Sequence, residues 1–556
     1  MAMDALVAGL AINGVERVVV SPGARSTPLV LACMRHRGLR LHVLPDERSA
    51  AFFALGITKA TGVPGAVIAT SGTAPAHWYP AVIEADQDHQ PLILLSADRP
   101  NELHGCGANQ TVDQQRMFGT HARAYFDLSG PEGPEARARL AAAAGARAVA
   151  ESRGPVPGPV QINVPLREPL VPDPLPDPPG AIGVPRVIRD GRQVCDEAVA
   201  ALAARLSGRR GIIVAGRLPR SVGLARAVTG LAQTLACPVF ADPLSGLRFG
   251  RHDRGRLIRG YDLLLESVHG AGSPPAEWAL ILGEAPVSRA LQRLVSGIRE
   301  QIVVAPYSPW PDPEGGATQV IQGDAAQVCE RLARYPLESA EPSWMGGFEQ
   351  AVSRLDALLG AEPGGLPVEA GILRALFDAC PEGTQVFCAN SMVIRDVDAF
   401  VPGHGREVTL VGNRGASGID GNVSTVLGMA AARSGPVVGV LGDLAFYHDM
   451  NGLLAAREVD ATLILFNNGG GGIFSYLPQA RLEGFERYWR TPVDLDFARA
   501  AALYGLGHER VSEAAGFERA FRAALKRPGV NLIEVEIDHR HSVARHLGLH
   551  RALAGI

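Results

Sequence analysis

Two oxygen-bearing side chains, Asp443 and Asn468, each follow a short apolar run in GPVVGVLGDLAFYHDMNGLLAAREVDATLILFNNGGGGIF. The runs are continuous, as is typical of strands buried on both faces of a parallel sheet. Since the carboxyl ends of parallel strands meet at one edge, both side chains should point into one crevice. A hard cation such as Mg²⁺ takes oxygen ligands, and glycines let the backbone approach phosphate closely. The pattern therefore predicts a site for a metal ion and a diphosphate.

A simpler interpretation is a strand–turn pair in which Asp443 caps a helix and Asn468 fills a turn. A remote pattern favours the chemical interpretation. Glu47 stands in LHVLPDERSAAFFALGITKATG, which predicts a strand, a turn and a helix, and residues 66–74 read AVIATSGTA. A lone glutamate there could instead complement the positive end of the helix dipole. The two patterns together indicate a cofactor held from two parts of the chain.

These segments resemble the thiamin-diphosphate-dependent enzymes, whose fingerprint is GDG followed later by NN. The resemblance implies that Asp443, the Asn468 side chain and the Gly470 carbonyl hold Mg²⁺ (or Mn²⁺) at the diphosphate. It also implies that Glu47 is the catalytic residue, because a carboxyl group at N1′ of the aminopyrimidine favours the tautomer that removes the C2 proton. The chain departs from the fingerprint at Leu444, where relatives have Gly, and its spacer of 22 residues (445–466) is short. The other cofactor-binding residues implied are Thr70, Ser71, Gly72, Ser391, Gly418, Ile419, Gly442, Leu444 and Ile473.

Five further segments narrow the resemblance: SPGARSTPLVLA (21–32), SADRPNEL (96–103), GANQTVDQ (107–114), ANSMVIRDVD (389–398) and GNRGASGIDGNVST (412–425). They resemble the 2-succinyl-5-enolpyruvyl-6-hydroxy-3-cyclohexene-1-carboxylate (SEPHCHC) synthase family of menaquinone biosynthesis. The middle of the chain matches only loosely. The resemblance implies a transferase that decarboxylates 2-oxoglutarate and adds the succinyl-enamine to isochorismate, giving SEPHCHC and CO₂.

Both substrates are anionic, so planar, bidentate arginines suit them. In the family, residues matching Ser391 and Arg395 are expected to hold the succinyl carboxylate. Those matching Arg25, Arg99 and Gln110 are expected to serve the acceptor. Arg289 and Arg414 complete the implied substrate-binding set, although any single arginine could be a solvated surface residue.

The resemblance also implies an apolar part of the site. Ile419 is the expected wedge that bends the cofactor, and Ile473, Phe474 and Leu477 form a dry wall over the thiazolium. The last three could instead belong to a core. Two positions depart from the family: Ala24 replaces a frequent Ser, and Ser288 with Arg289 replaces a Lys-Arg pair.

Apolar runs alternate with helical stretches along the whole chain. This alternation predicts the α/β class, with three doubly wound parallel-sheet domains. Eleven prolines between Pro155 and Pro185 predict an extended linker, and a weaker break lies at 335–367. We place a pyrimidine-binding domain at 1–170, a central α/β domain at 186–335 and a diphosphate-binding domain at 350–556.

The bulk composition excludes some classes of function. Net charge is −4 with 20% charged residues, so no basic face indicates nucleic-acid or membrane-surface binding. No run is long and apolar enough for a stable membrane anchor, and the N-terminus lacks the basic start of a signal peptide. The seven cysteines are scattered without CxxC spacing, which favours a reducing cytoplasm. The resemblance implies a homodimer or a dimer of dimers.

Two other functions stay open on the sequence. One is an acetolactate-synthase-like carboligase or decarboxylase of 2-oxoacids, with FAD in the middle domain. The arginine set and the missing nucleotide fingerprint near GIIVAGRLPR (211–220) argue against it. The other is a non-catalytic subunit with a thiamin fold, which would have no need of Glu47 beside Asp443 and Asn468.

Overall fold

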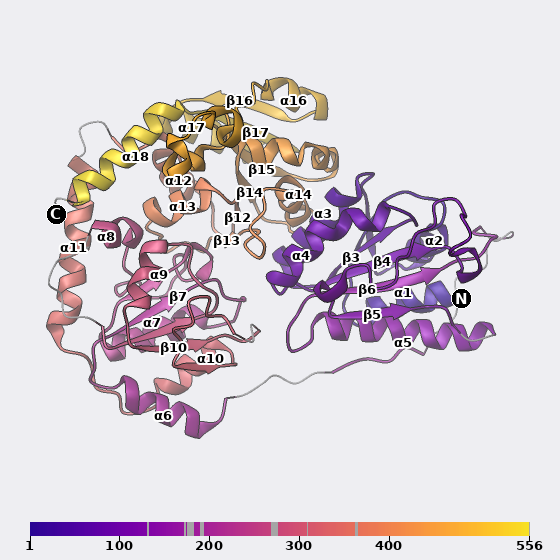
Figure 1. The fold of residues 1–556 in the computed structure, drawn as a ribbon, viewed down its shortest axis with the longest axis horizontal. Coiled ribbons are helices and arrows are strands. Elements are labelled where there is room, and N and C mark those ends of the chain that lie inside the picture. Colours follow the sequence, from indigo (N-terminus) through magenta and orange to yellow (C-terminus); the bar gives the residue numbers. More distant parts are fainter. Residues whose placement is uncertain are drawn as a thin grey trace.

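The computed structural model describes residues 1–554 except 131–132, 172–173, 175–182, 189–193, 268–275, 308–309 and 362–364. It contains three parallel sheets, each flanked by helices, which confirms the predicted α/β class (Figure 1). Part of the predicted linker between Pro155 and Pro185 lies outside the described residues.

The first sheet is built by the N-terminal part of the chain. Its strands are β1 (Arg17–Val20), β2 (Arg40–Val43), β3 (Gly65–Ala69), β4 (Leu92–Asp98), β5 (Ala124–Asp127) and β6 (Pro159–Pro165). Its helices are α1 (Ala2–Ile12), α2 (Thr27–Arg35), α3 (Glu47–Thr61), α4 (Tyr79–Gln87) and α5 (Pro134–Ser152). The strand order is β2-β1-β3-β4-β6-β5.

The middle sheet has the order β11-β10-β9-β7-β8. Its strands are β7 (Gly211–Ala215), β8 (Val239–Ala241), β9 (Trp278–Leu282), β10 (Glu300–Val304) and β11 (Gln319–Ile321). The helices of this part are α6 (Asp196–Leu206), α7 (Leu224–Leu235), α8 (Tyr261–Ser267), α9 (Arg289–Ser296), α10 (Ala325–Leu332) and α11 (Pro342–Ala361). The predicted start of the third domain at residue 350 falls inside α11, which packs on α8.

The third sheet has the order β13-β12-β14-β15-β17-β16. Its strands are β12 (Gln385–Cys388), β13 (Thr409–Val411), β14 (Val437–Gly442), β15 (Ala461–Asn467), β16 (Gly507–Val511) and β17 (Val530–Glu536). The α-helices of this part are α12 (Val368–Ala379), α13 (Met392–Phe400), α14 (Asn422–Ala432), α15 (Asp443–His448), α16 (Phe497–Tyr504), α17 (Ala514–Ala524) and α18 (His539–Ala554). Short 3-10 helices include η5 (Met450–Glu458) and η6 (Gly472–Tyr476).

Each sheet reverses its strand order once, and this reversal positions the loops that carry the motifs. In the first sheet the reversal lies between β1 and β3, and in the third it lies between β12 and β14. Crevices at such switch points are where open α/β sheets bind ligands. The loops that open there begin with Ser21 and Thr70 in the first sheet, and with Ala389 and Asp443 in the third.

Helix α3 of the first part packs closely against α14 of the third part. A Cβ on Gly56 would collide with the Thr425 carbonyl, and one on Gly428 with the Phe53 carbonyl. Phe52 and Phe53 are buried in one hydrophobic core with residues of α14. Because backbone contact of this kind tolerates no added side chain, the two outer sheets form one packed unit.

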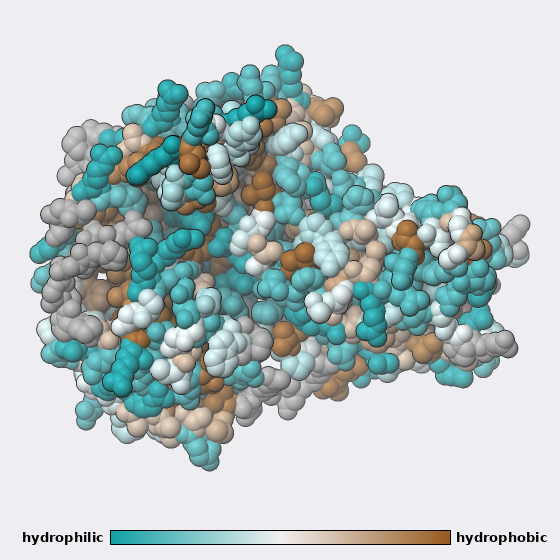
Figure 2. All heavy atoms as spheres, in the orientation of Figure 1, coloured by the Kyte–Doolittle hydropathy of each residue, from teal (hydrophilic) through white to brown (hydrophobic). Residues whose placement is uncertain are grey.

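Hydrophilic side chains dominate the face drawn in Figure 2, and hydrophobic ones are scattered singly or in small groups. In the part of the chain that the structure describes, no helix is both long and apolar enough to cross a membrane.

Candidate active site

The structure brings the predicted metal ligands together at the end of β14 and β15. Asp443 is buried, and its carboxylate oxygens accept hydrogen bonds from the amides of Leu444 (2.6 Å) and Gly470 (2.8 Å). Burial raises the pKa of the Asp443 carboxyl, and the backbone N–H groups oppose this shift. The carboxylate is therefore held rigidly by the two loops.

Asn468 supplies the second oxygen. Its Oδ1 atom is buried and has no hydrogen-bond partner among the described residues. A buried, unsatisfied acceptor is costly, and a cation or other donor at this place would remove the cost. With one carboxylate beside it, this donor set fits a hard divalent cation and a diphosphate.

The glycine loop after Asn468 adopts backbone that only glycine tolerates easily. Gly470 has φ of 140°, and a Cβ there would collide with the Arg490 carbonyl. Arg490 also donates to the Asn468 carbonyl at 2.7 Å and accepts from the Gly471 amide at 2.7 Å. Arg490 thus fixes the loop, a role that we did not predict.

The predicted cofactor residues of the first sheet lie beside the predicted acceptor residue Gln110. The Gln110 side chain donates to the Ser71 carbonyl at 2.9 Å, and the Ser71 hydroxyl donates to the Gln110 carbonyl at 3.0 Å. Thr70 lies against Gly23, since a Cβ on Gly23 would collide with it. Gln114, which we did not predict, accepts from the Gly72 amide at 3.1 Å.

Arg25 and Arg99 lie near each other at the carboxyl ends of this sheet. Arg25 is buried and donates to the Leu166 carbonyl (2.9 Å) and to Glu168 (3.2 Å). Burial lowers the pKa of Arg99, and the Arg25 charge lowers it further. Arg99 donates to the Asn109 carbonyl at 3.2 Å. The two cations form a local centre suited to an anion.

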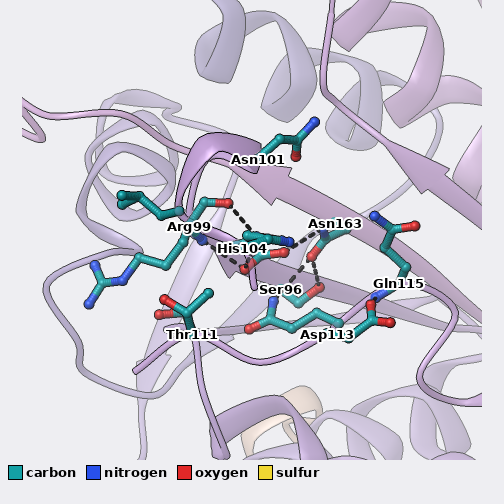
Figure 3. A network of polar contacts seen from close by, with 12 residues as sticks. Ser96, Arg99, Asn101, His104, Thr111, Asp113, Gln115 and Asn163 are labelled. Atoms are coloured by element: carbon teal, nitrogen blue, oxygen red, sulfur yellow. Dashed lines mark hydrogen bonds and ion pairs between the residues drawn. The ribbon is translucent and has the colours of Figure 1, made fainter. Parts of the chain in front are cut away.

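A buried polar network supports Arg99 from below (Figure 3). Asp98 is fully buried and accepts from the Arg99 amide (2.7 Å) and from Asn163 (2.9 Å). His104 hydrogen-bonds the Arg99 carbonyl at 3.0 Å. Figure 3 shows the Arg99 guanidinium pointing away from Asn163 and Ser96. The network therefore fixes the backbone of Arg99 and leaves its charged end for a ligand.

The remaining predicted arginines form a second positive centre, between the third and middle sheets. Burial lowers the pKa of Arg395, and the charges of Arg414 and Arg289 lower it further. Arg289 is exposed at the start of α9. Like charges held this close favour a bound anion.

Ser391 and Asn390 shape the turn that carries Arg395. Ser391 has φ of 67° and ψ of −128°, a strained conformation for a residue with a side chain. Asn390, which we did not predict, accepts from Arg414 at 2.8 Å and donates to the carbonyls of Asn413 (2.7 Å) and Gly418 (2.6 Å). Its place directly after a strand and before Ser391 is the signal that could have identified it.

The predicted apolar residues are not core residues. Ile419 is 37% exposed and Leu477 is 37% exposed. Ile473 and Phe474 are half-buried in and beside η6. Large apolar side chains that stay accessible beside a polar crevice are suited to contact a ligand.

Glu47 begins α3, after an N-terminal cap in which Asp46 accepts from the Ser49 amide at 3.0 Å. The side chain of Glu47 is half-buried and makes no hydrogen bond or ion pair with another described residue. Its neighbours are tied to the third part of the chain: Arg48 donates to the His448 carbonyl at 2.7 Å. The carboxylate is thus rigidly presented and available.

A buried ionic network between the three sheets was not predicted. Lys59 donates to Glu84 (3.2 Å), Asp88 (2.5 Å) and the Gly412 carbonyl (2.8 Å), and Arg217 pairs with Asp88. Glu84 also accepts from the amides of residues 415 and 416 at 2.9 and 2.7 Å. It holds the loop that ends in the predicted wedge. Nothing local in the sequence distinguishes these charges from surface ones.

Comparison with known proteins identifies the family. Residues 1–117 match the N-terminal TPP binding domain of thiamine pyrophosphate enzymes, and residues 404–535 match their C-terminal TPP binding domain. SEPHCHC synthases from Dechloromonas aromatica and Geobacillus kaustophilus are 41% and 43% identical over 540 and 566 residues. These alignments cover 96% and 99% of this chain, and 97% and 96% of the relatives. The chain belongs to the SEPHCHC synthase family.

A relative from Halobacterium salinarum (strain ATCC 29341 / DSM 671 / R1) is 41% identical over 552 residues, 95% of this chain and 94% of its own. The resemblance of the motifs to this synthase family is therefore confirmed. Since the thiamine pyrophosphate domains match the first and third sheets, their crevices are the cofactor-binding parts of a SEPHCHC synthase fold.

Proposed function

We propose that the protein decarboxylates 2-oxoglutarate and adds the succinyl unit to isochorismate, giving SEPHCHC and CO₂. The observation that carries the proposal is the close placement of Arg395, Arg414 and Arg289 beside the switch point that holds Asp443. A donor with a distal carboxylate needs such a cationic centre, whereas pyruvate does not.

Asp443, Asn468 and the Gly470 carbonyl would hold Mg²⁺ (or Mn²⁺), which would bind the diphosphate. The buried, unpartnered Asn468 Oδ1 next to the Asp443 carboxylate supports this assignment. When bound, thiamin diphosphate supplies a C2 carbanion and an electron sink for decarboxylation. Glycines 469 to 471 let the loop approach the phosphates without steric conflict.

The protein's own groups would position the substrates and hold one proton. Glu47 would hydrogen-bond N1′ of the aminopyrimidine, which favours the tautomer able to remove the C2 proton. Arg395 would clamp the distal carboxylate of 2-oxoglutarate, with Ser391 beside it. Arg25, Arg99 and Gln110 would orient the acceptor, and Phe474 with Leu477 would exclude water.

We further propose a homodimer, or a dimer of dimers, in which Glu47 of one chain serves the cofactor held by Asp443 of the other. The available Glu47 carboxylate supports this arrangement. The free cysteines, which include five buried ones, are consistent with a reducing cytoplasm.

The decisive assay offers the purified protein 2-oxoglutarate or pyruvate, each with and without isochorismate, and identifies products by mass. We expect SEPHCHC only from 2-oxoglutarate with isochorismate. Efficient use of pyruvate, or product formation that does not depend on isochorismate, would contradict the proposal.

A further inference from the structure

The C-terminal helix α18 contacts three separate parts of the site. At its start, His539 hydrogen-bonds the Ser475 hydroxyl of η6 at 2.8 Å. At its end, Leu549 and Leu553 are 2% and 1% exposed and belong to the same core as Tyr261 of α8. Figure 1 shows α18 running from the third sheet towards α8 and α11. One rigid element thus spans the apolar wall and the middle part of the chain.

His546, at the centre of α18, meets the helix that carries Arg395. Its Nε2 atom lies 3.2 Å from Asp396 Oδ1, and both side chains are buried. The ring also makes edge contacts with Phe400 of α13 and Tyr476 of η6, each at 5.7 Å between centroids. His546 therefore joins α13 and η6 through one side chain.

The surroundings of His546 are acidic. Glu369 of α12 accepts from the Ser542 hydroxyl at 2.5 Å, and its other oxygen is buried without a hydrogen-bond partner among the described residues. Burial, followed by the Asp396 and Glu369 charges, raises the pKa of the Tyr476 phenol. A histidinium at position 546 would compensate these carboxylates, and removing it would leave buried charge unpaired.

Arg395 needs such an anchor because its own surroundings repel it. The charges of Arg414 and Arg289 act against the Arg395 charge. Arg395 and Asp396 are successive residues of α13, so their side chains diverge by about 100° around the helix axis. The Asp396–His546 contact can therefore hold the helix from behind while Arg395 faces the cationic centre.

We propose that His546 and Asp396 are positioning residues for the dicarboxylic donor. Through them α18 fixes Arg395 relative to the apolar wall of Ile473, Phe474 and Leu477. The inference rests on the proposed role of Arg395 as the clamp for the distal carboxylate. It assigns the C-terminal helix, which carries none of the predicted site residues, to donor recognition.

The test compares His546→Phe and Asp396→Asn with the wild-type holoenzyme. Each variant keeps the volume of the side chain and removes the ionic contact. We expect the KM for 2-oxoglutarate to rise about tenfold, because small misplacements of a binding group cost that much or more. The KM for isochorismate and the Kd for thiamin diphosphate should change less than about twofold. His546→Gln, which can still donate to Asp396, should recover part of the loss.

Two controls separate positioning from general stability. Arg551→Ala changes an exposed residue of the same helix, and Ile213→Val weakens a distant core by about 1 kcal/mol. Both should keep the wild-type KM for 2-oxoglutarate. Equal rises in all KM values, or a rise in Ile213→Val to match His546→Phe, would overturn the inference.

Arg395→Ala distinguishes the two levels of the argument. If it raises the KM for 2-oxoglutarate while His546→Phe and Asp396→Asn do not, the positioning inference is wrong and the clamp stands. If Arg395→Ala itself leaves that KM unchanged, the proposed clamp is wrong, and the positioning inference that rests on it is overturned too.

Discussion

The Asp443 carboxylate accepts a 2.8 Å hydrogen bond from the Gly470 amide, 27 positions further along the chain. This contact joins the loop after β14 to the loop after β15, directly at the switch-point edge of the third sheet. Because the same carboxylate also accepts from the Leu444 amide, its orientation is fixed before any ligand binds. A preorganised carboxylate of this kind spends little conformational entropy when it binds a cation.

Removal of the proposed metal should abolish activity. Protein treated with a chelator should recover only when thiamin diphosphate and a divalent cation are both restored. Asp443→Ala should lose cofactor binding, because the cation would then face the diphosphate with too few protein oxygens. Calorimetric titration with thiamin diphosphate and Mg²⁺ measures this loss. Normal affinity in Asp443→Ala would contradict the metal assignment.

Glu47→Gln should separate cofactor binding from cofactor activation. The amide preserves shape but cannot support the required tautomer, so C2–H exchange should slow by about 10²–10⁴-fold. Exchange is measured by NMR on the bound cofactor, with calorimetry as the control for binding. Wild-type exchange in this variant would remove Glu47 from the mechanism.

Hybrid sites provide a test of the proposed dimer. Glu47→Gln and Asp443→Ala chains are each expected to be inactive alone. After mixing and verified subunit exchange, some dimers carry one intact site, so activity should reappear at up to about a quarter to a half of the wild-type value. A persistent lack of activity in exchanged dimers would mean that each site is built within one chain.

Arg395→Ala should weaken donor recognition selectively. Loss of a charge-assisted, bidentate contact costs about 1.5–3 kcal/mol, which lowers kcat/KM for 2-oxoglutarate about ten- to hundredfold. Pyruvate should be a poor donor for the wild type and lose little more in the variant. Arg395→Lys should recover only part of the activity, since an ammonium cannot pair in a fork. A uniform loss for both donors would argue against the clamp.

His546 should make stability depend on pH above neutrality. The Asp396 contact raises its pKa from 6.5 to about 9 against the opposing effect of burial, and Glu369 adds to the rise. A raised pKa stabilises the fold fully below pH 6.5, and this stabilisation is lost as the pH rises through about 9. The amount is about 2–3 kcal/mol. The melting temperature of wild type relative to His546→Gln should therefore fall between pH 6.5 and 9.5; a constant difference would contradict the linkage.

The sequence alone determined the α/β class and the chemistry of the third sheet. Continuous apolar runs can only be strands buried on both faces, and Asp443 and Asn468 follow such runs at places that topology must bring together. The same logic predicted the loop of Thr70, Ser71 and Gly72, which lies at the switch point of the first sheet. Local pattern was sufficient there because each residue's place depends on its own strand end.

Only the tertiary structure decided which groups support the site. Asn390, Arg490 and Glu84 act through backbone contacts made across long separations in sequence, and no local pattern marks them. The same holds for His546, whose partner Asp396 lies 150 positions away. Buried charges and amides are specified by what surrounds them, and these surroundings exist only once the sheets and helices have packed.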